Sequence, residues 1–201
     1  VSGQVLMQND NHVGGDAFIT YTFAADGDYV ISVRDARYIG NTKYVYCLKI
    51  SDRPHAHAVF PMAVQRGQSQ PVKIVGHQLG ANDAATVSAD ESATIGWDSH
   101  IVTADGGPTN PVPILITDTP QVIAEDGNHA ADAATPLTLP VGVSGRFTEN
   151  DQSHRFTFEA QKDHFFRFDI HAHRLGLALD ATVEIQDAAG KKLMVGDDGL
   201  Q

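Results

Sequence analysis

Three short acidic stretches carry the residue types that bind calcium. Ca²⁺ takes about six to eight oxygen ligands from carboxylates, amides and backbone carbonyls. The stretches supply such oxygens from these residues: Asn9, Asp10, Asn11, Glu125, Asp126, Asn128, Asp197 and Asp198. None of them has the spacing of an EF-hand, and Asp and Asn are also common in solvated turns. The sequence therefore predicts calcium as the candidate cofactor, with ordinary solvated turns as the alternative.

Histidines form the second group with metal chemistry. The chain has 10 of them, and the tripeptide HAH occurs twice, at His55/His57 and at His171/His173. Residues i and i+2 of a strand point to the same side, so each pair could give a zinc ion two ligands. A zinc site needs a third or fourth ligand, and neither pair has one nearby in sequence. The sequence alone favours histidines without a bound metal.

No motif of a known catalytic centre is present. The sequence lacks HExxH, G-x-S-x-G, a phosphate-binding Walker loop and the dinucleotide-binding glycine fingerprint. Ser153 and His154 are adjacent, and adjacent residues of a strand point in opposite directions, so they are not a nucleophile and its base. The prediction is a chain without enzymatic activity.

One aromatic residue is a candidate for ligand binding. Trp97 lies in the polar stretch TIGWDSH. A flat indole ring stacks well on the apolar face of a sugar. Tyr21, Tyr38 and Tyr44 are further aromatic candidates, but most of these rings are expected to fill sandwich cores. Trp97 is therefore the ligand-binding candidate to test first.

Composition restricts the partners. The formal net charge is -11, from 25 acidic and 14 basic residues. Nucleic acids and anionic membrane surfaces need clustered Lys and Arg, so neither is an expected partner. No apolar run approaches the roughly 18 residues of a membrane span, so no membrane insertion is expected.

Short apolar runs between 18 glycines and 9 prolines favour an all-β chain built of antiparallel β-sandwiches. Three antiparallel strands are expected in the first third, a prolyl linker after it, an edge strand around Pro113, and aromatic strands with a final hairpin in the last third. Pro113 indicates an edge because proline cannot donate to a ladder. The ranges are 17–23, 28–34, 43–50 (strands), 53–61 (linker), 110–120 (edge strand), 154–160 and 164–173 (aromatic strands), and 181–195 (hairpin).

The last third shows, in order along the chain, a strand-ending glycine, a polar turn, two aromatic strands, an LD step, a D-x-x-G hairpin and an acidic loop. These are Gly145, Asp151, Phe156 with Phe158, Phe166 with Phe168, Leu179 with Asp180, Asp187 with Gly190, and Asp197 with Asp198. In this order of motifs the last third resembles the first half of a bacterial pre-peptidase C-terminal (PPC) domain.

The opening resembles the second half of the same family. It has an acidic loop, an Asp before the next strand, a D-G-x-Y turn, a V-x-D step, a glycine loop and a closing Y-x-Y-x-L-x-I strand, in which Cys47 stands where the family often has Arg. The matching residues are Asn9 to Asn11, Asp16, Asp26 with Gly27 and Tyr29, Val33 with Asp35, Gly40, and Tyr44 to Ile50. The stretches GQVLMQNDNH and GKKLMVGDDG also match each other, as expected if the two partial modules overlap at the hairpin and acidic loop.

These resemblances imply a domain organisation. Residues 1–53 are expected to be the C-terminal half of a PPC-like jelly-roll or sandwich, 54–119 an immunoglobulin-like sandwich, and 120–201 the N-terminal half of another PPC-like module. Each half would expose an unpaired strand edge and an apolar face. The two halves are therefore expected to complete one another, within one chain or by self-association between chains.

The role implied is that of a non-catalytic region of a secreted or cell-surface bacterial protein. It would serve adhesion, binding or spacing, with a polysaccharide or an extracellular protein polymer as partner. The resemblance also implies a calcium site, because some relatives of the PPC fold bind calcium between an acidic linker and a later loop, and AEDGNHA stands where that linker would be. One alternative is a targeting or maturation segment of a secreted peptidase. Another is a metal-dependent hydrolase that uses the histidines.

Overall fold

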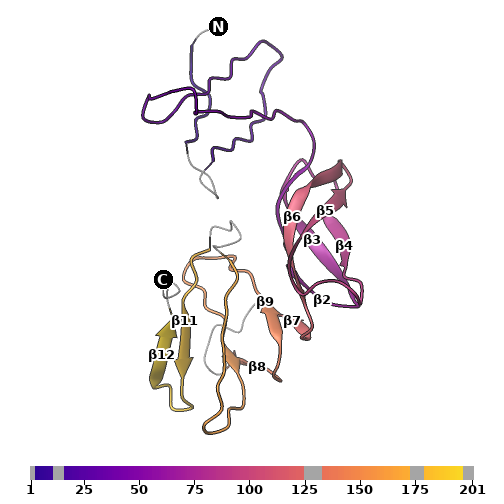
Figure 1. Cartoon of the computed structure of the whole chain (residues 1–201), viewed down its shortest axis with the longest axis vertical. Coiled ribbons are helices and arrows are strands. Elements are labelled where there is room, and N and C mark those ends of the chain that lie inside the picture. The colour runs from indigo at the N-terminus through magenta and orange to yellow at the C-terminus, as the bar shows by residue number, and fades with distance from the viewer. Residues whose placement is uncertain (1–2, 11–15, 125–132, 173–178, 197–201) are drawn as a thin grey trace. The chain divides into compact units, whose positions relative to one another are not determined.

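The computed structural model describes residues 3–10, 16–124, 133–172 and 179–196 (Figure 1). As predicted, the fold is all-β, and the described residues form no α-helix. The chain divides into two compact units, Asp52–Ile170 and Val1–Ser51 with His171–Gln201. The predicted domain boundaries after residues 53 and 119 stay a prediction.

Two three-stranded sheets form the first part of the Asp52–Ile170 unit. One has the order β1-β3-β4 and is antiparallel, and the other has the order β2-β6-β5, in which β2 runs parallel to β6. Their strands are β1 (His55–Phe60), β2 (Ala63–Gln65), β3 (Ser69–His77), β4 (Ala84–Ser88), β5 (Gly96–Ala104) and β6 (Gly107–Thr117).

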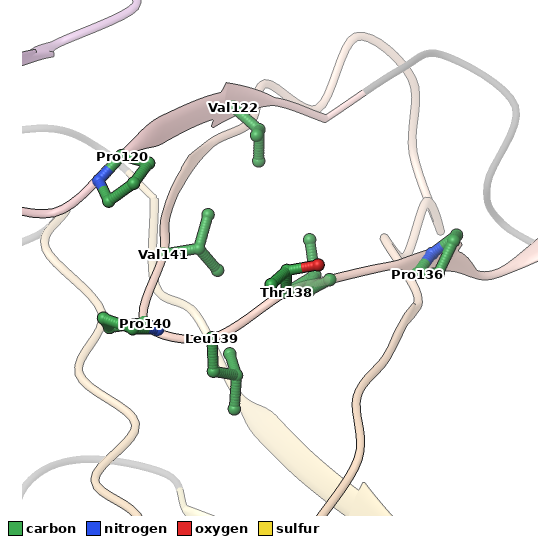
Figure 2. A pocket seen from close by; sticks show the side chains of 8 residues that line it. Pro120, Val122, Pro136, Thr138, Leu139, Pro140 and Val141 are labelled. Atoms are coloured by element: carbon green, nitrogen blue, oxygen red, sulfur yellow. The ribbon is translucent and has the colours of Figure 1, made fainter.

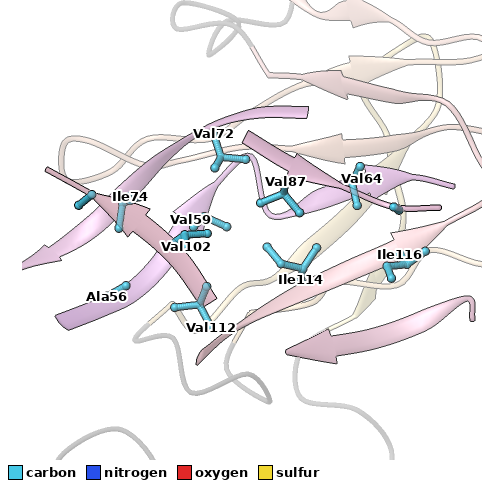
Figure 3. Close-up of a cluster of buried hydrophobic side chains, with 12 residues drawn as sticks. Ala56, Val59, Val64, Val72, Ile74, Val87, Val102, Val112, Ile114 and Ile116 are labelled. Atoms are coloured by element: carbon cyan, nitrogen blue, oxygen red, sulfur yellow. The ribbon is translucent and has the colours of Figure 1, made fainter. Parts of the chain in front are cut away.

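A single hydrophobic core joins the two sheets, which makes them a β-sandwich (Figure 3). Both sheets contribute alternate residues, as strands with one buried face must. Ile114, Val64 and Val112 are the largest fully buried side chains, and burying each contributes about 1.5–3 kcal/mol. The core residues are Ala56, Val59, Val64, Val72, Ile74, Val87, Ala89, Val102, Ala104, Val112, Ile114 and Ile116.

The stretch expected as a prolyl linker is strand β1, so that prediction is wrong. Ala56 and Val59 of this stretch are buried in the core. Pro54 precedes the strand and Pro61 follows it, so neither ring interrupts the ladder. The chain then enters the second sheet, where the N–H of Leu115 donates to the Met62 carbonyl over 2.9 Å.

The predicted edge strand is the central strand of its sheet, so that prediction is also wrong. β6 lies between β2 and β5. β2 pairs only with Leu115, Ile116 and Thr117. Pro111 and Pro113 therefore fall where β6 pairs with β5 but not with β2, and their missing N–H groups remove no bond from the short parallel ladder.

The rest of this unit holds two short parallel pairs. β7 pairs with β9, and β8 pairs with β10. Both are two-stranded sheets among the described residues, and a two-stranded sheet alone is marginally stable in water. Their bounds are β7 (Gln121–Ile123), β8 (Thr135–Pro136), β9 (Gly142–Ser144) and β10 (Phe156–Thr157).

The predicted aromatic strands are only partly present. β10 covers two residues, and residues 158–172 form no strand. The predicted alternation of side chains is nevertheless visible, because the ring of Phe158 lies 5.8 Å from that of Phe166 and 5.5 Å from that of Phe168. Phe165, on the opposite side of the alternation, is 91% exposed. Sequence pattern has therefore set the direction of these side chains without a complete ladder.

The predicted hairpin at the end of the chain is confirmed. β11 (Val183–Gln186) pairs antiparallel with β12 (Lys192–Gly196). The Asp187 carboxylate accepts hydrogen bonds from the N–H groups of Ala189 and Lys191, both at 2.9 Å. Gly190 has φ 81 and supplies the left-handed residue of this turn.

Residues 3–10 and 16–51, which we call the front segment, contain no strand, so the three strands predicted there are absent (Figure 1). The local turns are formed: the Asp35 carboxylate accepts from the N–H of Arg37 (2.9 Å), and the side-chain amide oxygen of Asn41 accepts from the N–H of Lys43 (2.8 Å). Turns need only neighbouring residues, whereas a ladder needs a partner strand to offset its ordering entropy. The front segment therefore forms the turns that would connect strands, but it forms no strands.

Candidate functional site

The residues predicted to bind calcium lie mostly outside the described residues. The calcium prediction stays untested for the residues that lie there, which are Asn11, Glu125, Asp126, Asn128, Asp197 and Asp198. Of the other two, Asp10 is exposed, and the Asn9 side-chain amide donates to the Phe18 carbonyl over 3.0 Å. In the part of the chain that the structure describes, no group of three or more His, Cys, Asp or Glu side chains is arranged to hold a metal ion.

We predict that calcium raises the melting temperature of the chain by several degrees. An ion that binds only the folded chain stabilises it in proportion to the logarithm of its concentration over Kd. The measurement is a thermal scan with excess CaCl₂ beside one with a chelator. Superimposed scans would show that calcium does not stabilise the folded chain.

Trp97, the predicted ligand-binding residue, lies on β5 opposite Leu115 of β6. Its side chain is 38% exposed, so part of the indole surface is covered and part faces solvent. This placement is compatible with a stacking contact to a sugar. The role of Trp97 stays a prediction.

An apolar hollow of about 420 Å³ lies beside β7, β8 and the loop between β8 and β9 (Figure 2). It has no titratable group in its lining, so it offers apolar contact and no acid, base or metal ligand. The lining residues are Pro120, Val122, Pro136, Leu137, Thr138, Leu139, Pro140 and Val141.

One carboxylate at the end of β4 has a perturbed acidity. The Ser92 hydroxyl and backbone N–H donate to Asp90 over 2.6 and 2.8 Å. These bonds, the side-chain one foremost, lower the pKa of Asp90 below its usual 3.8. The stabilisation from the ionised turn is present above the unfolded-state pKa and is lost as the pH falls through the folded-state value. The arrangement is that of a structural turn.

The structure brings three histidines together, which sequence reasoning missed. His55 and His57 on β1 have ring centroids 5.1 Å apart, and the ring of His57 lies 4.9 Å from that of His77 on β3. His77 is the cross-strand partner of His55. The signal in the sequence was His77 at the end of SQPVKIVGH, and it becomes readable only once β1 and β3 are known to pair. His173 of the second pair lies outside the described residues.

Among the described residues, the front segment carries the largest concentration of exposed apolar side chains. Val45 is 87% and Tyr46 74% exposed. The face predicted from alternation is visible in the ring contacts, with Tyr21 and Phe23 5.1 Å apart and Phe23 and Tyr29 4.2 Å apart. The segment also exposes Val5, Leu6, Met7, Ile19, Val30, Ile31, Val33, Tyr38, Ile39, Tyr44, Leu48 and Ile50.

Comparison of the chain with protein-family models, with curated proteins and with solved structures gave no match. None of the described residues forms a helix long and apolar enough to cross a membrane.

Proposed function

We propose that this chain is a non-catalytic binding or spacer region of a secreted or cell-surface bacterial protein, in which copies associate through their end segments. The ends are partial modules of the PPC type, and the sandwich between them is the immunoglobulin-like spacer. Calcium stabilises the acidic loops, and a polysaccharide or protein polymer is the partner. The order of motifs in the two end segments supports this assignment.

The observation that carries the proposal is the exposed apolar surface of the front segment. A run of exposed Val, Ile, Leu and Tyr side chains of this extent is typical of an interaction surface. Its alternating pattern is that of strands with one buried face, yet the segment forms no ladder. The front segment therefore requires further strands, which would supply backbone hydrogen bonds and cover its apolar side chains.

The occupant we propose is the last third of a second copy. The described part of that region holds only two-stranded sheets, β7 with β9, β8 with β10 and β11 with β12, so it lacks strands in the same way. The end of this region resembles the start of the front segment, as two overlapping partial modules would. Association of front to back is heterologous and extends to an array unless it closes into a ring or a swapped dimer.

Light scattering over a dilution series tests the proposal. We expect the full chain to give masses above that of one copy, decreasing on dilution. Val45→Asp should raise the dissociation constant at least about tenfold, because it removes an apolar contact and places a charge in the interface. Val75→Asp, at an exposed position of β3 in the sandwich, is the matched control and should leave the masses unchanged.

A monomer at every concentration would contradict self-association. Equal dissociation constants for Val45→Asp and Val75→Asp would show that association does not use the front segment. Either result removes the proposed assembly.

A further inference from the structure

We propose that the Asp98 carboxylate closes the outer edge of strand β5 and so prevents a second copy of the chain from adding its own β5 there. β5 is the outermost strand of the sheet β2-β6-β5, and among the described residues no strand pairs with its outer edge. Such an edge presents backbone N–H and C=O groups to which another strand can pair. The inference rests on the sandwich alone and does not depend on the proposed function.

The hydrogen bonds of β6 show which groups of β5 face this edge. The N–H of Leu115 donates to the Met62 carbonyl beside β2, so the backbone polar groups of Leu115 point away from β5. Trp97 is the partner of Leu115 in the antiparallel ladder. In such a pair both residues point their N–H and C=O groups away from each other. The backbone groups of Trp97, and by alternation those of Ser99 and Ile101, therefore face the outer edge.

The Asp98 carboxylate lies at the middle of this edge. One of its oxygens accepts a hydrogen bond from the Ser99 N–H over 2.8 Å, and the other lies 3.2 Å from Nε2 of His100. Asp98 and His100 are two residues apart and therefore project from the same side of the strand. The Asp98 side chain is 57% exposed, so water still solvates the charge. The central N–H group of the edge is thus already bonded to a hydrated carboxylate.

A strand that pairs with this edge has to displace the carboxylate. The carbonyl of the incoming strand needs the Ser99 N–H as its donor, and that N–H already makes a charge-assisted bond to Asp98. The added strand would also remove water from the carboxylate, which is costly for a charge that gains no new partner. Charged side chains at edge strands are a common protection against such pairing. We therefore expect Asp98 to keep the edge closed.

The strand that Asp98 excludes is β5 of a second copy. Antiparallel pairing of two β5 strands about Ser99 would place Trp97 of each copy opposite Ile101 of the other. These two side chains are 38% and 62% exposed. An aromatic ring opposite a β-branched side chain is a favourable cross-strand pair. The contact would be the same on both copies, so it would close in a dimer rather than extend to an array.

Disulfide trapping across the edge tests this inference. Antiparallel pairing about Ser99 sets the two Ser99 Cα atoms about 5.5 Å apart, which suits a disulfide. The full chain carries Cys47→Ser, so that Ser99→Cys supplies its only thiol, and Val45→Asp, which separates this test from association through the front segment. We expect Asp98→Ala to speed formation of the linked dimer at least about tenfold, the effect of losing one hydrogen bond to a charged group.

Two variants are matched controls. Asp83→Ala removes the same charge from the sandwich, where Asp83 lies 3.4 Å from Lys73, and should leave the cross-linking rate of Ser99→Cys unchanged. Thr103→Cys, at an exposed position of β5, should not cross-link when combined with Asp98→Ala, because the two Thr103 residues would lie at opposite ends of the paired strands. Asp98→Ala itself should keep the melting temperature of the chain, since the side chain is largely exposed.

Hydrogen–deuterium exchange gives an independent readout. In dilute Asp98→Ala the Ser99 amide should exchange faster than in the wild type, because it has lost its acceptor. In the linked dimer the amides of Trp97, Ser99 and Ile101 should become protected together. Equal cross-linking rates with and without Asp98→Ala, equal rates for Ser99→Cys and Thr103→Cys, or an unchanged exchange rate of the Ser99 amide would overturn the inference.

Discussion

Replacing Ile114 by alanine should lower the free energy of unfolding of the sandwich by about 2–5 kcal/mol. Ile114 is 1% exposed and lies on β6, the central strand of its sheet. It belongs to the core that both sheets share. The substitution removes apolar contacts and leaves a cavity that the surrounding strands cannot close. Chemical denaturation followed by the fluorescence of Trp97, the single tryptophan, reports on this unit directly.

The matched control is Ile101→Ala on the neighbouring strand β5. Ile101 is 62% exposed, so the same change of side chain should cost well under about 1 kcal/mol. Equal losses at the two positions would mean that Ile114 does not lie at the centre of a core between two sheets.

Asn110→Ala should lower the free energy of unfolding of the sandwich by about 2–4 kcal/mol. The substitution removes both hydrogen bonds to the backbone of the buried residue Ala56. Each buried polar group left without a partner costs about 1–3 kcal/mol. Strand β1 then loses its anchor to the opposite sheet. Chemical denaturation of the variant measures the loss.

Asn82→Ala provides the comparison. Its side-chain oxygen accepts one bond from the N–H of Ala84, over 3.0 Å, in an exposed turn. Water replaces such a partner readily, so the loss of unfolding free energy should stay below about 1 kcal/mol. If Asn110→Ala were as mild as Asn82→Ala, the two contacts to Ala56 would be of no consequence for the fold.

The periodicity of the sequence correctly predicted the structural features that depend on a single strand or a single turn. The all-β class, the final hairpin and the alternation of Phe158, Phe166 and Phe168 follow from a period of two and from turn residues such as Asp187 and Gly190. These features are present in the structure.

The placement of strands in sheets depends on pairing, which the sequence pattern does not contain. Pro113 indicated an edge, but the short β2 meets β6 only from Leu115 onward. Pro54 and Pro61 suggested a linker, although they only bracket β1. A proline excludes a hydrogen bond at one position and does not exclude the strand.

The histidine cluster shows the same limit at the level of chemistry. His55 and His57 are visible as a pair in the sequence, and their third neighbour His77 becomes visible only through the β1–β3 register. Sequence spacing alone therefore misses side chains that a ladder brings together.

The front segment is where local preference and tertiary structure differ most. Its residue pattern predicts three strands, and its turns at Asp35 and Asn41 are formed. Strand pairing is a long-range interaction, and under the proposed assignment the front segment is half of a sandwich, which cannot bury enough apolar surface to stabilise its strands. The segment should therefore become a sheet only when a complementary half is present.

Hydrogen–deuterium exchange of the backbone amides of residues 17–50 tests that claim most directly. The chain is followed from dilute to concentrated solution, and the exchange rates are compared with the mass from light scattering. The account predicts that these amides exchange rapidly in single copies and become protected, in the alternating manner of paired strands, as the mass rises. Amides that exchange just as rapidly in the largest species would contradict it.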